Sequence, residues 1–299
     1  MSDARSDAAM NEPRLHEVAC LHNQALHRMV FWEWGDADAP DLLLCLHGLT
    51  RQGRDFDALA RVLAGRYRVV CPDVLGRGRS DWLADPMGYA VPHYVGHMVT
   101  LLARLNARHV DVFGTSMGGL IGLGLANLAG SPVRKLVLND VGPVIEAQAI
   151  QRIGSYIGQP AHWPSLAAAA TALRAISTGF GPHSDAQWLD LTRPQLKADA
   201  ERGGFVPRCD PAIAVPFKAL TPELACLGEA ALWHAYDRLQ CQTLLLRGAE
   251  SDLLSHETAL AMTQRGPHAS LHEFAGVGHA PTLVQDDQIE VVRRFLSSS

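Results

Sequence analysis

The segment VDVFGTSMGGLIGLGLA, residues 110–126, places one serine among several glycines where two sequence patterns meet. The apolar run before Ser116 is typical of a buried strand, and the run of Gly, Ala and Leu after it is typical of a closely packed helix. Gly114 and Gly118 stand two residues before and two residues after the serine. We interpret the segment as a sharp strand–turn–helix in which side chains at those two positions would collide.

A serine at such a turn has the position of a nucleophile. The pentapeptide from Gly114 to Gly118 matches the pattern G-x-S-x-G, in which the serine occupies a strained turn between a strand and a helix. The helix that begins after Ser116 also favours negative charge at its N-terminus. The alternative is a glycine-rich helix cap that contains an ordinary serine.

The rest of the chain repeats the strand-then-helix order. Apolar runs without alternation are typical of buried parallel strands, and they cover residues 41–47, 67–73, 109–114, 134–140 and 242–248, with a weaker candidate at 269–274. Helical patterns fall between them, at about 55–65, 92–106, 117–130, 255–265 and 285–297. Two alternating stretches, 16–23 and 27–35, are expected to form an antiparallel edge hairpin. This order predicts an α/β fold with a mostly parallel, doubly wound sheet.

The alternation stops at residue 142. Residues 143–217 contain helical pieces, clearest at 165–177 and 185–200, and no strand pattern. About 75 residues is too long for a plain loop, so we expect a helical cap inserted over the sheet edge. A further helix over about 222–238 leads back to the sheet. The predicted organisation is therefore a core of residues 15–142 and 218–299, a cap of residues 143–217 and a flexible N-terminal tail of residues 1–14.

A serine hydroxyl needs a base, and the base needs an acid. Among the 14 histidines, His279 follows the last predicted strand in a glycine-rich loop, where the chain last passes the carboxyl edge of the sheet. Asp252 comes just after the strand at 242–248 and is our choice for the acid. Glu250 is a near competitor, and Asp140 is a more serious one because it also ends a strand. The predicted catalytic residues are Ser116, Asp252 and His279.

Acyl chemistry also needs donors for the oxyanion. The backbone N–H of Met117, beside the serine, is one candidate. The segment HGLT, residues 47–50, follows the first buried strand and offers the backbone N–H of Leu49 as the second. Gly48 would let this loop approach the substrate, and we expect His47 to anchor the loop rather than act as a base.

Taken together, these motifs resemble those of the α/β-hydrolase fold superfamily, in particular its cap-bearing serine esterases and lactonases. The matching motifs, in the order of that family, are HGLT (47–50), DVLGRGRS (73–80), GTSMGG (114–119), RGAESD (247–252) and GHAP (278–281). The resemblance implies hydrolysis of an ester, lactone, thioester, amide or carbon–carbon bond through a serine triad, without a cofactor. It also implies that residues 143–217 form the cap.

We therefore expect a serine hydrolase that cleaves a small carboxylic ester, lactone or thioester through an acyl-enzyme. One alternative is a carbon–carbon bond hydrolase of ring-cleavage products on the same triad, in which Arg174, Arg193 or Arg208 could bind the dienoate. Another is a non-catalytic binding protein on this scaffold. The aromatic residues of the predicted cap are candidate pocket walls, although each could equally bury a cap helix; they are Trp163, Phe180, Trp188 and Phe217.

Composition limits the possible partners. The chain has 299 residues, 47% of them hydrophobic, which is enough for a sizeable core. A formal net charge of −5 gives no indication of binding to nucleic acid or to an anionic membrane surface. The chain has no run of about 18 apolar residues that could span a membrane. We expect a small-molecule substrate, no nucleic acid and no membrane, and leave open whether the protein is a monomer or a homodimer.

The cysteines and histidines indicate neither a redox centre nor a metal site. None of the six cysteines forms a CxxC pair, and those in or beside strands are expected to be small buried hydrophobes, which favours a reduced, cytoplasmic protein. The polar N-terminus has no apolar signal-peptide region. His93 and His97 have the spacing of a zinc pair but no evident third ligand, so we expect no metal.

Overall fold

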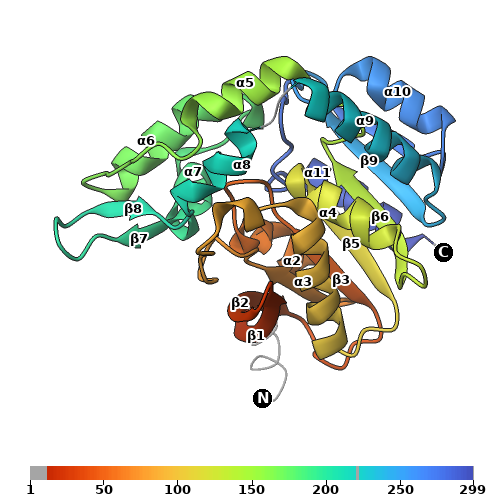
Figure 1. Ribbon diagram of the computed structural model, residues 1–299, viewed down its shortest axis with the longest axis horizontal. Helices are drawn as coiled ribbons and strands as arrows, with labels where there is room; N and C mark the ends of the chain where they lie inside the picture. The colour runs from red at the N-terminus through yellow and green to blue at the C-terminus, as the bar shows by residue number, and fades with distance from the viewer. Residues whose placement is uncertain (1–11, 220–221, 299) are drawn as a thin grey trace.

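The computed structural model describes residues 12–219 and 222–298. Its centre is an eight-stranded sheet with the order β1-β2-β4-β3-β5-β6-β9-β10 (Figure 1). Six strands are parallel: β3 (Leu42–Leu46), β4 (Arg68–Pro72), β5 (Val110–Thr115), β6 (Val133–Asn139), β9 (Gln242–Gly248) and β10 (Ser270–Phe274). The expected α/β fold with a mostly parallel, doubly wound sheet is confirmed.

The antiparallel edge hairpin is also present. Strands β1 (Arg14–His22) and β2 (Ala25–Trp34) pair with each other, and β2 continues antiparallel onto β4. The expected N-terminal tail falls largely on residues 1–11, which lie outside the described part of the chain, and Arg14 already belongs to β1.

Two hydrophobic clusters lie on the two faces of the sheet. Alternate residues of β3 divide between them, because successive side chains of a strand point to opposite faces. Buried side chains of α3 (Val91–Arg104), α4 (Met117–Ala126) and α10 (His256–Gln264) belong to the first cluster. Those of α2 (Asp57–Leu63) and α11 (Asp286–Ser297) belong to the second. The sheet is therefore covered on both sides, and its carboxyl edge is left for a site.

Between β6 and α9 (Pro222–Asp237) the chain forms a separate group of elements beside the sheet, on the left of Figure 1. Its helices are α5 (Ala147–Tyr156), α6 (Leu166–Ile176), α7 (Asp185–Thr192) and α8 (Ala214–Lys218). The expectation that this segment contains no strand is wrong, because β7 (Leu196–Ala198) and β8 (Phe205–Pro207) form an antiparallel hairpin.

The helix expected over residues 185–200 ends at Thr192. Pro194 follows two residues later within a short 3-10 turn, and proline interrupts α-helical hydrogen bonding. Within the described residues, no helix combines the length and the apolar character needed to cross a membrane.

Candidate active site

Ser116 lies at the turn between β5 and α4, as the sequence indicated. Its backbone has φ 52° and ψ −119°, a conformation that non-glycine residues rarely adopt. A Cβ atom at Gly114 would lie 2.4 Å from the carbonyl carbon of Gly118, and a Cβ at Gly118 would lie 2.0 Å from the carbonyl oxygen of Leu46. The two glycines are therefore required by the close approach of backbone segments.

A hydrogen-bonded chain of three side chains begins at this serine. His279 Nε2 lies 3.1 Å from Ser116 Oγ, and His279 Nδ1 lies 2.7 Å from Asp140 Oδ2. Because a carboxylate only accepts, Nδ1 carries the hydrogen and Nε2 is free to accept the hydrogen of the serine hydroxyl. An imidazole in this state can take the serine proton as the oxygen attacks an electrophile.

The acidic residue that contacts His279 is Asp140, and the prediction of Asp252 for this position is wrong. The Asp140 carboxylate is fully buried and also accepts hydrogen bonds from the Gly248 N–H (2.9 Å) and the Ser251 hydroxyl (2.6 Å). Asp140 has φ 56°, a left-handed conformation that aspartate tolerates better than most residues. This conformation accompanies a carboxylate that is directed toward the loop after β9 and toward His279.

Asp252 has a different partner. Arg152 of α5 donates to both of its carboxylate oxygens, at 2.5 Å and 2.8 Å. Burial raises the pKa of Asp252, but the hydrogen bonds and the charge of Arg152 outweigh burial and leave the pKa below its ordinary value. Asp252 therefore ties the sheet edge to the segment that follows β6. Glu250, the other competitor, lines the same cavity without joining the chain of hydrogen bonds.

The loop after β3 brings a second element to the serine. A Cβ atom at Gly48 would lie 3.9 Å from Ser116 Cβ, so the loop passes directly beside this serine. His47 is fully buried; its Nδ1–H donates to Gly48 O (2.8 Å) and its Nε2 accepts from the Val74 N–H (3.0 Å). Burial lowers the pKa of His47 to about 3, so the ring is neutral and anchors the loop. Leu49 lies on this loop, and Met117 is the first residue of α4.

Ser116 and His279 open into a cavity of about 930 Å³ between the carboxyl edge of the sheet and the segment that follows β6. Of the four aromatic residues predicted as walls, Trp163 and Phe180 line the cavity. The prediction is wrong for Trp188, a buried residue that stacks against Phe180 with ring centroids 6.0 Å apart. It is also wrong for Phe217, which packs against the core.

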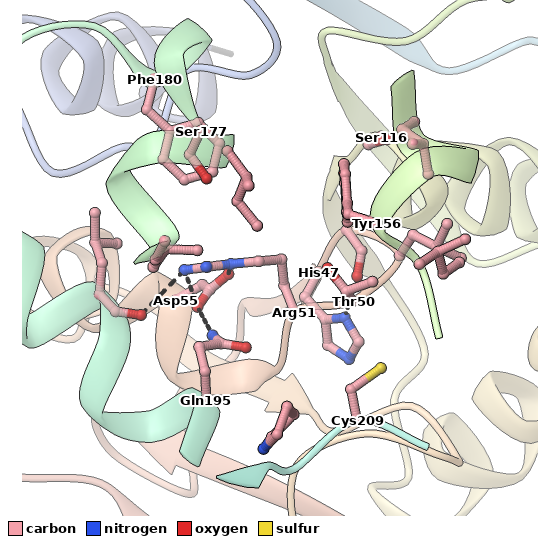
Figure 2. A pocket seen from close by; sticks show the side chains of 18 of the residues that line it. His47, Thr50, Arg51, Asp55, Ser116, Tyr156, Ser177, Phe180, Gln195 and Cys209 are labelled. Carbon is pink, nitrogen blue, oxygen red and sulfur yellow. Dashed lines mark hydrogen bonds and ion pairs between the residues drawn. The ribbon is translucent and has the colours of Figure 1, made fainter. Parts of the chain in front are cut away.

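Two ion pairs line this cavity, Arg51 with Asp55 and Arg152 with Asp252. Figure 2 shows Arg51 bound to Asp55 across the cavity from Ser116, with Gln195 donating to the same carboxylate at 2.8 Å. Arg51 Nη2 also reaches Leu191 O at 3.3 Å, so this group joins the sheet to the helical segment. The contacts to Leu191 and Gln195 each join residues 140 positions apart, and no local sequence pattern could have indicated them.

The rings of His93 and His97 pack around the ring of His22. The ring centroids of His93 and His97 lie 4.8 Å and 5.6 Å from that of His22. In the described parts of the chain, no group of three or more His, Cys, Asp or Glu side chains could hold a metal ion.

Comparison with known proteins agrees with this architecture. Residues 43–294 match the sequence profile of the alpha/beta hydrolase family. The 3-hydroxybutyrate-oligomer hydrolase of Cupriavidus necator is 51% identical over 291 residues, which cover 96% of this chain and 99% of that protein. A 2-hydroxymuconate semialdehyde hydrolase of a Pseudomonas species is 30% identical over 243 residues, 79% of this chain and 76% of that protein.

A solved structure gives the same result. An alpha/beta hydrolase from Novosphingobium aromaticivorans superposes with a TM-score of 0.83 at 34% identity, covering 95% of this chain and 98% of that one. The chain belongs to the alpha/beta hydrolase family and is a hydrolase, as the family profile, the relatives and the doubly wound sheet all indicate.

Proposed function

We propose that this protein hydrolyses the ester bonds of short 3-hydroxybutyrate oligomers through an acyl-enzyme on Ser116. The observation that carries the chemistry is the hydrogen-bonded chain from Ser116 through His279 to Asp140, which opens into the cavity. The substrate class is suggested by the 51% identity to a 3-hydroxybutyrate-oligomer hydrolase over nearly the full length of both chains.

In this proposal His279 Nε2 takes the Ser116 proton as Oγ attacks the ester carbonyl carbon. The carbonyl oxygen becomes an oxyanion, which the N–H groups of Leu49 and Met117 stabilise. The intermediate collapses, the carbon–oxygen bond to the alcohol breaks, and His279 protonates the leaving alcohol. Water, activated by His279, then releases the acid from Ser116. Asp140 orients the imidazole and stabilises its charged form, and no cofactor is needed.

The cavity suits a largely uncharged chain of esters. Its volume is about 930 Å³, at the upper end of the range for small-molecule sites. Of the cations that line the cavity, Arg51 and Arg152 are each bound to a carboxylate, and Lys197 lies 4.8 Å from the centre of the Trp82 ring. An oligomer of hydroxy acids presents neutral ester groups between its two ends, so its interior units need no free charge from the protein.

A carbon–carbon bond hydrolase is the second candidate. The relative that supports it is the 2-hydroxymuconate semialdehyde hydrolase, which is 30% identical over 79% of this chain. Such a reaction would need a cation for the dienoate. Arg174, Arg193 and Arg208, which the sequence offered for this role, do not line the cavity. Lys197 does line it, so ester hydrolysis is placed first on the 51% identity to a 3-hydroxybutyrate-oligomer hydrolase.

The test measures release of 3-hydroxybutyrate from the linear trimer, together with labelling by a fluorophosphonate probe. Ser116→Ala should abolish both, while the control Ser177→Ala, a serine that lines the same cavity, should retain both. Trimer turnover by Ser116→Ala would contradict the role of the serine. Turnover of a vinylogous diketo acid without turnover of the trimer would favour the carbon–carbon hydrolase. Tight binding of the trimer without turnover would favour a binding protein.

A further inference from the structure

Arg77 is a buried cation with unusual partners. Its side chain is fully buried in the turn after β4, and none of the described carboxylates forms an ion pair with it. Its guanidinium instead donates to neutral acceptors, namely Leu49 O (2.8 Å), Leu75 O (2.8 Å), Tyr94 Oη (2.6 Å) and Met117 Sδ (3.6 Å). The rings of Tyr89 and Tyr94 lie 5.5 Å and 5.1 Å from its central carbon.

Burial of a cation without a carboxylate is costly, because the lost hydration must be replaced by weaker interactions. An apolar side chain of similar volume would fill this space at lower cost. The contacts of Arg77 indicate what the charge contributes. Nε donates to Leu49, Nη2 contacts Met117, and these two residues are the proposed oxyanion donors.

The geometry of the loop after β3 shows how such contacts aim an N–H group. The carbonyl of Gly48 and the N–H of Leu49 belong to one planar peptide and point in opposite directions. Gly48 O accepts from His47 Nδ1 (2.8 Å) and from the Arg51 N–H (3.1 Å), so this peptide is fixed at its carbonyl end. Arg77 fixes the next carbonyl, that of Leu49. The carbonyl groups of Gly48 and Leu49 are thus both fixed, and these contacts fix the direction of the Leu49 N–H that lies between them.

We propose that Arg77 is a positioning residue of the oxyanion hole, which holds Leu49 and Met117 in register so that their N–H groups converge on one oxygen. The positive charge of the guanidinium also favours negative charge on that oxygen, because the site is buried and electrostatic effects are weakly screened there. This inference rests on the proposed function, since it assigns a role within an acyl-transfer site.

Arg77→Lys and Arg77→Met should separate this role from a structural one. Lysine keeps the charge but cannot contact both residues, and methionine removes the charge and the donors. We expect kcat for p-nitrophenyl butyrate to fall about 100-fold in Arg77→Met, the cost of a misplaced catalytic group, with a smaller fall in Arg77→Lys and little change in KM. The inhibition constant of a trifluoromethyl ketone, whose adduct carries an oxyanion, should rise by the same factor.

Two controls match the perturbation. Tyr94→Phe removes one Arg77 partner but leaves the contacts to Leu49 and Met117 in place. Arg134→Met breaks the bonds to buried Asp111 at the amino edge of the sheet. Both should lower thermal stability and leave the ketone inhibition constant within about threefold, well below the 100-fold effect expected from misplacing a catalytic group.

The outcomes are distinct. If Arg77→Met does not fold, the trifluoromethyl ketone inhibition constant of Arg77→Lys is measured instead. A loss of stability in Arg77→Lys with unchanged kcat and unchanged ketone inhibition would overturn the proposal. Failure of the proposed function would be seen separately, in the wild-type protein, as absence of ester turnover or of Ser116 labelling.

Discussion

Replacing Asp140 by Asn should lower kcat by about 10⁴-fold, the loss expected when the histidine is held in the wrong tautomer. Asp140 Oδ1 accepts from the Gly248 N–H, so the asparagine oxygen is retained on that side. Its amide NH2 then occupies the position of Oδ2 and faces His279 Nδ1. The ring must accept there and carry its hydrogen on Nε2, where it cannot take the Ser116 proton. A factor of 10⁴ corresponds to about 5 kcal/mol of transition-state stabilisation.

Asp252→Asn is the matched comparison. This carboxylate is about one-third exposed and pairs with Arg152, so its loss should cost about 1 kcal/mol of stability or less. We expect kcat to change by less than tenfold, because the substitution removes only the partly exposed ion pair with Arg152. The assay is steady-state hydrolysis of p-nitrophenyl butyrate by both variants, with circular dichroism spectra to confirm folding. A large loss in Asp252→Asn with near wild-type kcat in Asp140→Asn would refute the assignment of Asp140.

Three further predictions concern stability and binding. Burial and the nearby histidines lower the pKa of His97 to about 4, so the unfolded chain binds this proton more tightly and up to about 3 kcal/mol of stability should be lost as the pH falls from 6.5 to 4. Urea unfolding should show an acid loss about 3 kcal/mol smaller in His97→Phe than in the wild type and in exposed His268→Gln, because buried His47 still contributes to the loss in all three; equal losses in all three would contradict it. Gly118→Ala should lower the free energy of unfolding by about 3 kcal/mol because its Cβ meets Leu46 O, whereas Gly228→Ala, with open space in helix α9, should raise it by about 0.5–1 kcal/mol. Phe180→Ala should raise KM for the trimer about tenfold, equivalent to 1.4 kcal/mol of lost contact, with kcat nearly unchanged; a change in kcat alone would argue against a binding role.

The sequence predicted the fold well because its signals are local. The glycines around Ser116 indicate a tight turn whatever surrounds it. The alternation over residues 16–23 and 27–35 indicates an antiparallel edge hairpin, although β2 is buried on both faces from Met29 to Trp34. The position of His279 after the last strand then follows from the order of the parallel strands.

The acid could not be chosen in the same way. Asp140 follows β6 and Asp252 follows β9, and these strands are neighbours, so both side chains reach the same edge of the sheet. The choice depends on the left-handed conformation of Asp140 and on the ion pair of Asp252 with Arg152, which lies 100 residues away. Neither can be inferred from spacing.

The segment after β6 was harder to predict for related reasons. Strands β7 and β8 are only three residues long, too short for alternation to be visible. Trp188 and Phe180 are both aromatic. Only their packing shows that Phe180 lines the cavity and that Trp188 stacks against Phe180 from behind it. The sequence contains Arg77 only within the motif at residues 73–80, because its partners Leu49 and Met117 lie after two other strands.

The most direct measurement is the trapping of the covalent intermediate. The wild-type protein is mixed with the 3-hydroxybutyrate trimer, quenched in acid within milliseconds and examined by peptide mass spectrometry. We expect one or more 3-hydroxybutyryl units on the peptide that contains Ser116, with none in Ser116→Ala. Turnover of the trimer without any acyl group on Ser116, or with the acyl group on another residue, would contradict an acyl-enzyme on Ser116.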